Sequence, residues 1–543
     1  MTPDAGPGVY ADAATRVLGR ALSRLDAEPT SLSHGSFDRT WWCWKFTDSP
    51  ASRFQEGAYL LAWLYTSERA PEGYRGSTKV LHSAEAAVRF WKTLQHADGS
   101  FDEAYPFERS LAATAFTAFY IGSAAERLSP HWSAAAASVV DDGLRGAADW
   151  LARSSETHGV ISNHLAAAAA ALEIAGERLG TDRYHGARDR YIETIMNAAN
   201  LDEGWFREYD GADPGYQSHA MFYLADLWRR TGDEALAGAL KSACRFMGWF
   251  AHPDGTLGGE YASRGTKFAY PAAFEMLAAV EPAAAALAAH TRRTVRLERT
   301  IGPSVVDAWN LFPLLNNYLF AADAARDLGT PPALPWAAPD ASATFPDCGL
   351  SVLRRGDRVA AIGPASGGAI KVWHIATGAL EYQDCGYAQA AGSGVALSHA
   401  PSDWTVEDGA GAITFAIDGR FRMLPQARFD PWRFAAFRLF SLTLGRFAAV
   451  SRWLKHQLVR ALIRRRDETG AVLQRRIVIA RDGRVTIEDR ISGATNVRAL
   501  DRQVPVHMGS SRYAHQEEWL AARVACAEPE RSGPSEWRRS VEL

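Results

Sequence analysis

Apolar residues in the first 330 positions recur at the spacing of an α-helix. Stretches such as RFQEGAYLLAWLYTSE (53–68) and HAMFYLADLWRRTGD (219–233) place them three and four positions apart. That spacing is typical of helices that bury one face. The same pattern returns from about residue 10 to about residue 330, so we expect one helix after another over this part of the chain.

The breaks between the predicted helices resemble one another. They are HADGSFDE (96–103), DEGWFREYDG (202–211), HPDGTLGGEY (252–261) and, more weakly, ETHGVISNH (156–164). Their glycines, Gly99, Gly159, Gly204 and Gly255, recur roughly every 50 residues, about the length of one helical hairpin with its loops. This repeat predicts helical hairpins arranged as an α/α toroid, with an open solenoid as the alternative.

The pattern changes after the Pro- and Ala-rich stretch LGTPPALPWAAPDASATFPDCG (328–349). Segments such as GAITFAIDGRFRM and LQRRIVIARDGRVTIEDRISG alternate apolar and polar residues between Gly-containing turns, which indicates antiparallel β-strands in a sandwich. The predicted fold class is therefore α+β and multidomain. We expect an α/α toroid at 1–330, a linker at 331–348, a β-sandwich at 349–525 and a disordered tail at 526–543.

One segment interrupts the strand pattern. Residues 431–466 contain nine Lys and Arg and no acidic residue. On one helix, an apolar stripe would include Phe437, Phe440, Leu444, Phe447, Leu454, Leu458 and Leu462. The opposite face would carry Arg438, Arg446, Arg452, Arg460 and Arg464. Such a basic amphipathic helix can lie in an anionic membrane surface as a peripheral contact. The alternative is a long helix packed on the β domain with a solvated basic face.

Composition narrows the choice of partner and compartment. The net charge is −3, so nucleic acid is not the expected partner. The cysteines contain no CxxC pair, which suits a reducing compartment; they are Cys43, Cys244, Cys348, Cys385 and Cys526. We see no signal peptide and no run of about 18 apolar residues, and so expect a cytoplasmic protein, or one peripheral to a membrane. The 18 tryptophans suit either a sugar-binding cleft or a large core.

Candidate chemistry begins at the alanine-rich stretch ISNHLAAAAAALEIAG (161–176), where Asn163 and His164 stand at the first turn of a predicted helix. Asn163 could simply cap that helix. Loops expected at the same end of the toroid contribute further ionisable and phenolic residues, each of which also has a structural interpretation. They are Glu103, Tyr105, Glu108, Arg109, Tyr209, Asp213, Tyr216, Glu260, Tyr261 and Arg264.

Together these residues fit β-elimination of a uronic acid-containing polysaccharide. The reaction needs a group that neutralises the uronate carboxylate, a base that removes the proton from C5, and an acid that protonates the departing O4. Asn163, His164, Tyr216 and Arg109 supply such a set. No metal and no organic cofactor is required.

The motifs SNHLAA and GADPGYQ make the chain resemble the heparinase II/III-like and alginate lyase-like polysaccharide lyases. Those proteins join an α/α toroid to a C-terminal antiparallel β domain. They use an Asn-His pair at a helix start and a tyrosine a little over fifty residues later, which the resemblance carries onto Asn163, His164 and Tyr216. It implies that Asn163 binds the carboxylate, His164 acts as base or carboxylate ligand, and Tyr216 acts as acid, or as both base and acid.

For substrate binding we predict a wider set: Glu103, Tyr105, Glu108, Arg109, Tyr261, Arg264 and His374. The expected partner is an acidic polysaccharide or oligosaccharide. Family members often carry a run of His and Asp in the β domain that holds a structural zinc. The corresponding stretch here, GGAIKVWHIATGALEYQDCGYAQ, keeps His374 and Asp384 but not that spacing, so we predict no metal. A family member without a signal peptide is expected in polysaccharide assembly or tailoring.

Three other functions fit the same sequence. A glycoside hydrolase would need two carboxylates on either side of one bond, from Glu103, Glu108, Asp202 and Asp213. A uronate C5-epimerase would share the first step of the lyase reaction and return a proton to C5. A glycan-binding protein held at a membrane by 431–466 would not depend on Tyr216.

Overall fold

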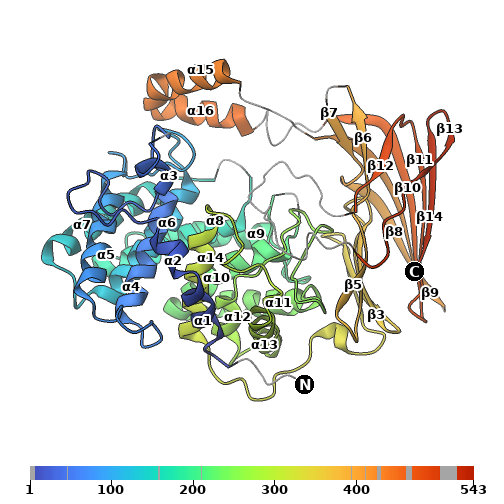
Figure 1. Cartoon of the computed structure of the whole chain (residues 1–543), viewed down its shortest axis with the longest axis horizontal. Helices are drawn as coiled ribbons and strands as arrows, with labels where there is room; N and C mark the ends of the chain where they lie inside the picture. Colours follow the sequence, from blue (N-terminus) through green and yellow to red (C-terminus); the bar gives the residue numbers. More distant parts are fainter. Residues whose placement is uncertain are drawn as a thin grey trace.

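The structure is a computed structural model that describes residues 6–45, 47–156, 159–209, 211–392, 394–409, 411–424, 430–459, 467–501 and 522–543. Helices fill its first part and antiparallel sheets its second, and the two parts lie side by side (Figure 1). The predicted class, an α+β chain with a helical domain followed by a β domain, is confirmed.

The helices of the first part form two concentric rings. The inner ring consists of α4 (Gly57–Thr66), α6 (Leu111–Leu128), α8 (Ser162–Leu179), α10 (Pro214–Thr231), α12 (Ala272–Leu277) and α14 (Leu311–Ala324). Each inner helix contacts the next, and α14 contacts α4. The outer ring consists of α5 (Thr78–Thr93), α7 (Ala134–Leu151), α9 (His185–Ala198), α11 (Glu234–Trp249), α13 (Pro282–Arg296) and α1 (Val9–Arg16). The toroid is therefore closed, and the open solenoid is excluded.

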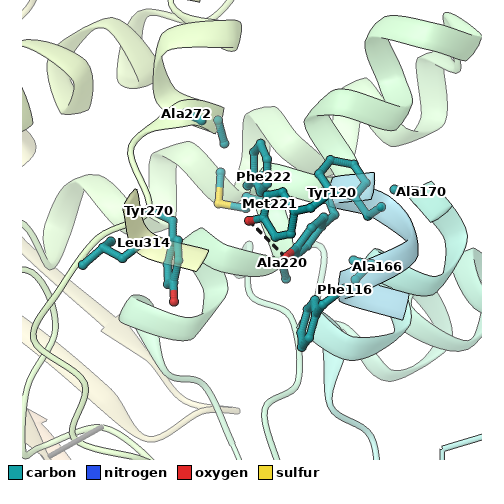
Figure 2. Close-up of a cluster of buried hydrophobic side chains, with 14 of the residues drawn as sticks. Phe116, Tyr120, Ala166, Ala170, Ala220, Met221, Phe222, Tyr270, Ala272 and Leu314 are labelled. Carbon is teal, nitrogen blue, oxygen red and sulfur yellow. Dashed lines mark hydrogen bonds between the residues drawn. The ribbon is translucent and has the colours of Figure 1, made fainter. Parts of the chain in front are cut away.

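The alanine-rich helix α8 is an inner helix with neighbours on several sides. It contacts α6 and α10 in its own ring and α7 and α9 outside it, and Ala166 to Ala171 are all buried. Small side chains let the helices approach closely. A Cβ added to Gly122 of α6 would lie 2.3 Å from Cγ2 of Ile174. Figure 2 shows the resulting core, in which Phe116 and Tyr120 of α6 meet side chains from the next inner helices.

The Gly-containing turns repeat in three dimensions. A Cβ at Gly99, whose φ is +95°, would lie 2.0 Å from the carbonyl oxygen of Gly146 in the following outer helix. Gly204 and Gly255 also have positive φ. Gly204 meets the carbonyl oxygen of Ser242 in α11, and Gly255 meets the side chain of Thr294 in α13. These positions require glycine because both the left-handed backbone and the close approach exclude a side chain. Gly159 shares the positive φ but has no such contact within 4 Å.

Shorter helices complete the helical part: α2 (Leu18–Leu22), α3 (Arg39–Trp42) and the 3-10 turn η1 (Ser52–Glu56). The smaller sheet has the order β1 (Ser342–Phe345), β2 (Leu350–Arg355), β3 (Arg358–Gly363), β4 (Ala369–His374), β5 (Ala379–Asp384). The larger sheet has the order β12 (Val497–Ala499), β6 (Tyr387–Ala391), β7 (Gly394–Leu397), β9 (Ala412–Met423), β10 (Glu468–Ala480), β11 (Val485–Ser492), β14 (Glu536–Glu542), β13 (Glu530–Gly533), with β8 (Ser402–Asp408) also on β9.

The two sheets pack face to face as predicted. Alternate residues of the smaller sheet, such as Leu353 and Ile362, share a core with Phe415 and Ile477 of the larger one. Ile477 lies opposite Phe415 on β9 and Ile487 on β11, so the register pairs apolar residues across neighbouring strands. The other face of the smaller sheet belongs to the core of the toroid, for example through Val352, Val359 and Trp373. The smaller sheet therefore joins the two domains.

Two predicted boundaries were wrong. The expected linker contains the 3-10 turn η2 (Pro335–Ala337) and strand β1, which pairs with β2. The expected disordered tail forms β13 and β14, and β14 pairs with β11 over seven positions, Glu536 to Glu542. Trp537, Arg539 and Val541 point to the same side of β14. Arg539 sits at an inward position, so a buried charge hides the apolar alternation of this strand.

The basic segment is two helices rather than one. They are α15 (Pro431–Leu442) and α16 (Ala448–Val459), separated by the 3-10 turn η3 (Leu444–Arg446). This helical pair stands over the helical domain, away from the sheets (Figure 1), so the alternative of one long helix packed on the β domain is wrong. Leu444 and Phe447 of the predicted stripe are exposed. Arg460, Leu462 and Arg464 lie outside the described residues.

Candidate active site

A cavity of about 540 Å³ opens at the end of the toroid where the inner helices α6, α8 and α10 begin. All three predicted catalytic residues, Asn163, His164 and Tyr216, line it. The predicted binding residues Glu103, Glu108 and Arg264 line it too. Residues that the sequence did not single out also contribute: Arg53, Glu156, His219, Tyr270, Asp307, Trp309, Asn310 and Lys455.

Asn163 is fixed by a buried carboxylate. Helix α8 begins at Ser162 after an N-cap at Ile161, so Asn163 is not the helix cap that one interpretation of the sequence gave it. Its backbone N–H and its Nδ2 both donate to Oε1 of Glu208 at 3.0 Å, and Nδ2 also lies 3.1 Å from Oε2. Because a carboxylate only accepts, Glu208 determines which end of the amide faces it. Burial raises the pKa of Glu208 to about 7.

His164 is held by a second carboxylate. Its Nδ1 lies 2.8 Å from Oε2 of Glu156, and its ring meets Phe116 edge-on at 5.6 Å between centroids. An ionised carboxylate requires the proton on Nδ1, which leaves the lone pair of a neutral imidazole on Nε2. The pair with Glu156 therefore gives His164 the tautomer that a general base needs.

Tyr216 lies in the first turn of α10 beneath a guanidinium. Asp213 caps this helix by accepting from the backbone N–H of Tyr216 at 3.0 Å, and its other oxygen accepts from the N–H of Arg264. The guanidinium carbon of Arg264 lies 3.9 Å from the ring centroid of Tyr216 and 4.9 Å from that of Tyr209. Burial opposes the charge, but attraction by Tyr216 and its neighbours raises the pKa of Arg264. This cation–π contact holds the Tyr216 ring in place at the cavity wall.

His219 adds a neutral imidazole three residues further along α10. Its ring stacks on Tyr270 at 3.9 Å between centroids, and Nε2 lies 3.0 Å from the hydroxyl of Tyr223. Burial, together with the positive charge of Arg53, lowers the pKa of His219 well below its usual value. The imidazole is therefore uncharged at neutral pH.

The carboxylates that line the cavity are engaged with donors. Glu103 pairs with Arg53 at 3.1 Å. Glu108 accepts from the backbone N–H groups of Glu103 and Ala104 and lies 3.6 Å from Nζ of Lys455, a residue of α16. Two further hydrolase candidates do not line the cavity: Asp213 is buried as a helix cap and Asp202 is exposed.

Four predicted binding residues lie elsewhere. Arg109 lines an adjoining cavity and donates to the carbonyl oxygens of Gly445 and Arg446, which ties its loop to the helical pair. Tyr105 packs edge-on against Phe437 of α15. Tyr261 is buried between the domains, with its hydroxyl 2.8 Å from Nε2 of His252. His374 ends β4 outside both cavities and pairs with an aspartate of its own sheet, Asp357.

The stretch compared with a zinc-binding run is occupied by ion pairs. Asp384 is fully buried and accepts from Arg475 at 3.1 Å and from Arg539. The same two arginines bind Asp489, at 2.8 and 2.7 Å. Across the described residues, no group of three or more His, Cys, Asp and Glu side chains is placed to hold a metal ion.

A known protein family matches most of the helical domain. Residues 47–296 match the family model of the ulvan lyase N-terminal domain. This segment carries five of the six inner helices assigned among the described residues, together with Asn163, His164 and Tyr216. No curated protein matches the chain.

Solved structures extend the likeness over both domains. The chondroitin AC lyase of Streptomyces coelicolor A3, solved with chondroitin sulphate, is 14% identical with a TM-score of 0.54, over 91% of this chain and 68% of that one. A Paenibacillus xanthan lyase is 11% identical with a TM-score of 0.53, over 91% and 47%. A heparinase III is 10% identical with a TM-score of 0.50, over 91% and 73%. The chain has a polysaccharide lyase fold.

This lyase fold confirms the resemblance that SNHLAA and GADPGYQ indicated. The chain spans about half the length of the xanthan lyase, so the fold is shared without all of that protein's parts. The family model names ulvan lyases rather than heparinases.

Proposed function

We propose that the protein cleaves a uronic acid-containing polysaccharide by β-elimination. The observation that carries this proposal is the convergence of Asn163, His164 and Tyr216 on one cavity. Each of them has a supporting residue that suits the role: Glu208 for the amide, Glu156 for the imidazole and Arg264 for the phenol. The polysaccharide lyase fold and the ulvan lyase family model support the same reaction class.

The reaction moves two protons: one is removed from C5, and one is added to O4. Asn163 has two amide hydrogens, and a hydrogen not used by Glu208 can bind the uronate carboxylate and make the C5 proton more acidic. Nε2 of His164 removes that proton, a double bond forms between C4 and C5, and the C4–O4 bond breaks. Tyr216 donates its phenolic proton to O4. If Tyr216 acts as both base and acid, His164 is instead a carboxylate ligand.

The surroundings favour an acidic polymer. Arg53, Arg264 and Lys455 line the catalytic cavity. The four carboxylates that also line it accept from donors of the protein itself; they are Glu103, Glu108, Glu156 and Asp307. The adjoining cavity, of about 340 Å³, is lined by four cationic side chains and two carboxylates; the cations are Arg109, Arg153, Arg452 and Lys455. Trp309 lines the first cavity and Trp150 the second, and an aromatic face suits a sugar ring.

Ulvan is the first substrate to test because the family model names ulvan lyases. Chondroitin sulphate and xanthan come next, from the names of the structural relatives. A heparinase-type specificity rests on likeness of fold, at 10% identity for the heparinase III compared above. Within a cell, the reaction would serve assembly or tailoring of such a polymer.

Hydrolysis fits the geometry less well. A glycosidase needs one protonated and one free carboxylate on either side of the bond. Here Glu103, Glu108 and Glu156 are already engaged with Arg53, with backbone N–H groups and Lys455, and with His164. The arrangement leaves no evident acid–base pair of carboxylates among the described lining residues.

The test is to incubate purified protein with ulvan, chondroitin sulphate, xanthan and heparin, and to follow the ultraviolet absorbance of the conjugated C4–C5 double bond. Elimination predicts that absorbance and new reducing ends rise together. New reducing ends without absorbance would indicate hydrolysis. Exchange of the C5 proton for deuterium without chain cleavage would indicate epimerisation, and binding without any of these would indicate a glycan-binding protein.

A further inference from the structure

The helical pair, residues 431–459, buries polar side chains and exposes apolar ones. The residues that it buries are small or polar: Ser441, Gly445, Ser451 and Lys455. Ser451 donates to the carbonyl oxygen of Phe107. The buried side chains of the pair are thus small or polar, the reverse of what an amphipathic helix buries on its own protein, although the partly buried Phe437 also packs against Tyr105.

The helical pair exposes large apolar side chains. Trp432 is 85% exposed, Leu439 67%, Phe447 65% and Trp453 57%. Seven of the sixteen exposed large hydrophobic side chains in the described part of the chain lie between positions 432 and 453; the other three of the seven are Phe434, Leu442 and Leu444. Soluble surfaces seldom gather apolar residues so densely, and such a face normally has a partner.

Positive charge beside these apolar side chains indicates a negatively charged partner. Arg433 and Arg446 are exposed beside the apolar residues. Residues 431–466 hold nine Lys and Arg and no acidic residue, in a chain whose net charge is −3. The partner must therefore be both apolar and negatively charged. A bilayer with anionic headgroups has both properties at one surface, and tryptophan and arginine are suited to the boundary between headgroups and acyl chains.

We propose that the helical pair docks the protein on an anionic lipid surface. The apolar residues enter the headgroup boundary and the arginines contact the headgroups. This contact is peripheral, since no described helix has the length and apolarity to cross a bilayer. The opposite side of α16 supplies Lys455 to the catalytic cavity, so docking holds the entrance of that cavity close to the lipid surface.

The experiment is flotation of the full chain with vesicles of phosphatidylcholine alone and of phosphatidylcholine with phosphatidylglycerol. The test variant is Trp432→Glu, Leu439→Glu, Phe447→Glu. A matched control, Leu32→Glu, Leu201→Glu, Val406→Glu, adds the same charge at exposed apolar residues elsewhere. We expect the wild type and the control to float with anionic vesicles, and the test variant to lose at least tenfold in partitioning. Thermal unfolding and activity on soluble oligosaccharide should be unchanged in all three.

Three outcomes would overturn the proposal. The wild type could fail to float with anionic vesicles, or the control could lose as much partitioning as the test variant. Sedimentation could also show a wild-type dimer that the test variant converts to a monomer without any vesicle binding, which would make a second copy of the chain the occupant of this face. Because flotation needs no turnover, the result does not depend on whether the protein is a lyase.

Discussion

The carboxylate of Glu208 accepts hydrogen bonds from both the backbone and the side chain of Asn163, 45 residues earlier in the chain. Through these bonds the segment before α10 fixes the first turn of α8. The amide of Asn163 is therefore held in place before any substrate arrives. Preorganisation of this kind matters because a small displacement of a binding group can cost about 10²-fold in rate.

Replacing Glu208 by Gln should lower kcat on the cleaved polysaccharide by about 10²-fold with little change in KM. The new side-chain NH2 faces the donors of Asn163, so the asparagine amide moves. Burial raises the pKa of Glu208 to about 7, so its carboxylate becomes charged as the pH rises through about 7. The wild type should gain activity over that range, and Glu208→Gln should lose this part of the pH profile of kcat.

Glu203→Gln is the control for that variant. Glu203 accepts from Nε1 of Trp205 and from the backbone N–H of Asp347, outside the cavity. Its replacement should leave the pH profile unchanged. Equal pH profiles in wild type and Glu208→Gln would show that Glu208 has only a structural role.

Arg475→Met should destabilise the protein by about 3–5 kcal/mol, because it leaves Asp384 and Asp489 buried with a single arginine. The neighbouring residue provides the control. Arg476 points to the other face of β10 and pairs with the exposed Glu488 at 3.6 Å, so Arg476→Met should cost less than about 1 kcal/mol. Chemical denaturation measures both. Similar losses in the two variants would contradict the account of this buried cluster.

Stability should fall in mild acid because of His252. Burial lowers the pKa of this imidazole to about 3, while in the unfolded chain it takes up a proton near pH 6.5. The contribution of His252 to the free energy of unfolding is therefore complete above about pH 6.5. It is lost as the pH falls toward 3, at up to about 1.4 kcal/mol per pH unit. His252→Gln should reduce the dependence of the unfolding free energy on pH between 6.5 and 5, and the buried imidazoles of His219 and His290 should maintain the remainder. An unchanged slope would contradict this assignment.

Glu260, at the same domain interface, affects stability at lower pH. Burial opposes the charge of Glu260, but Lys267 and Lys371 lower its pKa to about 2. A depressed carboxyl pKa stabilises the fold above about 4.5, and this contribution is lost as the pH falls through about 2. The loss from Glu260 therefore begins at a lower pH than the loss from His252, and the two overlap between about pH 4.5 and 3.

Local patterns predicted the architecture well. Helical spacing and the repeated turn glycines gave the toroid, and alternation gave the sandwich, because both depend on which residues face a core. The failures occurred where a buried residue is not apolar. Arg539 points inward on β14, and its charge made a strand look like a disordered tail.

The candidate site was predicted only in part. Asn163, His164 and Tyr216 belong to short motifs and could be recognised. The residues that support them lie far away in sequence or carry no motif: Glu208 is 45 positions from Asn163, and Arg264 is 48 positions after Tyr216. Such pairings form only when neighbouring helical hairpins pack against each other. Tyr261 stood in an equivalent loop, yet it is turned into the domain interface.

The most direct test of the central claim compares Tyr216→Phe with Tyr261→Phe on the polysaccharide that the wild type cleaves. Both variants remove one hydroxyl from a buried tyrosine, but only Tyr216 lines the cavity. The account predicts that Tyr216→Phe loses at least about 10²-fold in the rate of ultraviolet absorbance, the usual contribution of general acid–base catalysis, and that Tyr261→Phe retains its rate. Full activity of Tyr216→Phe would contradict the account.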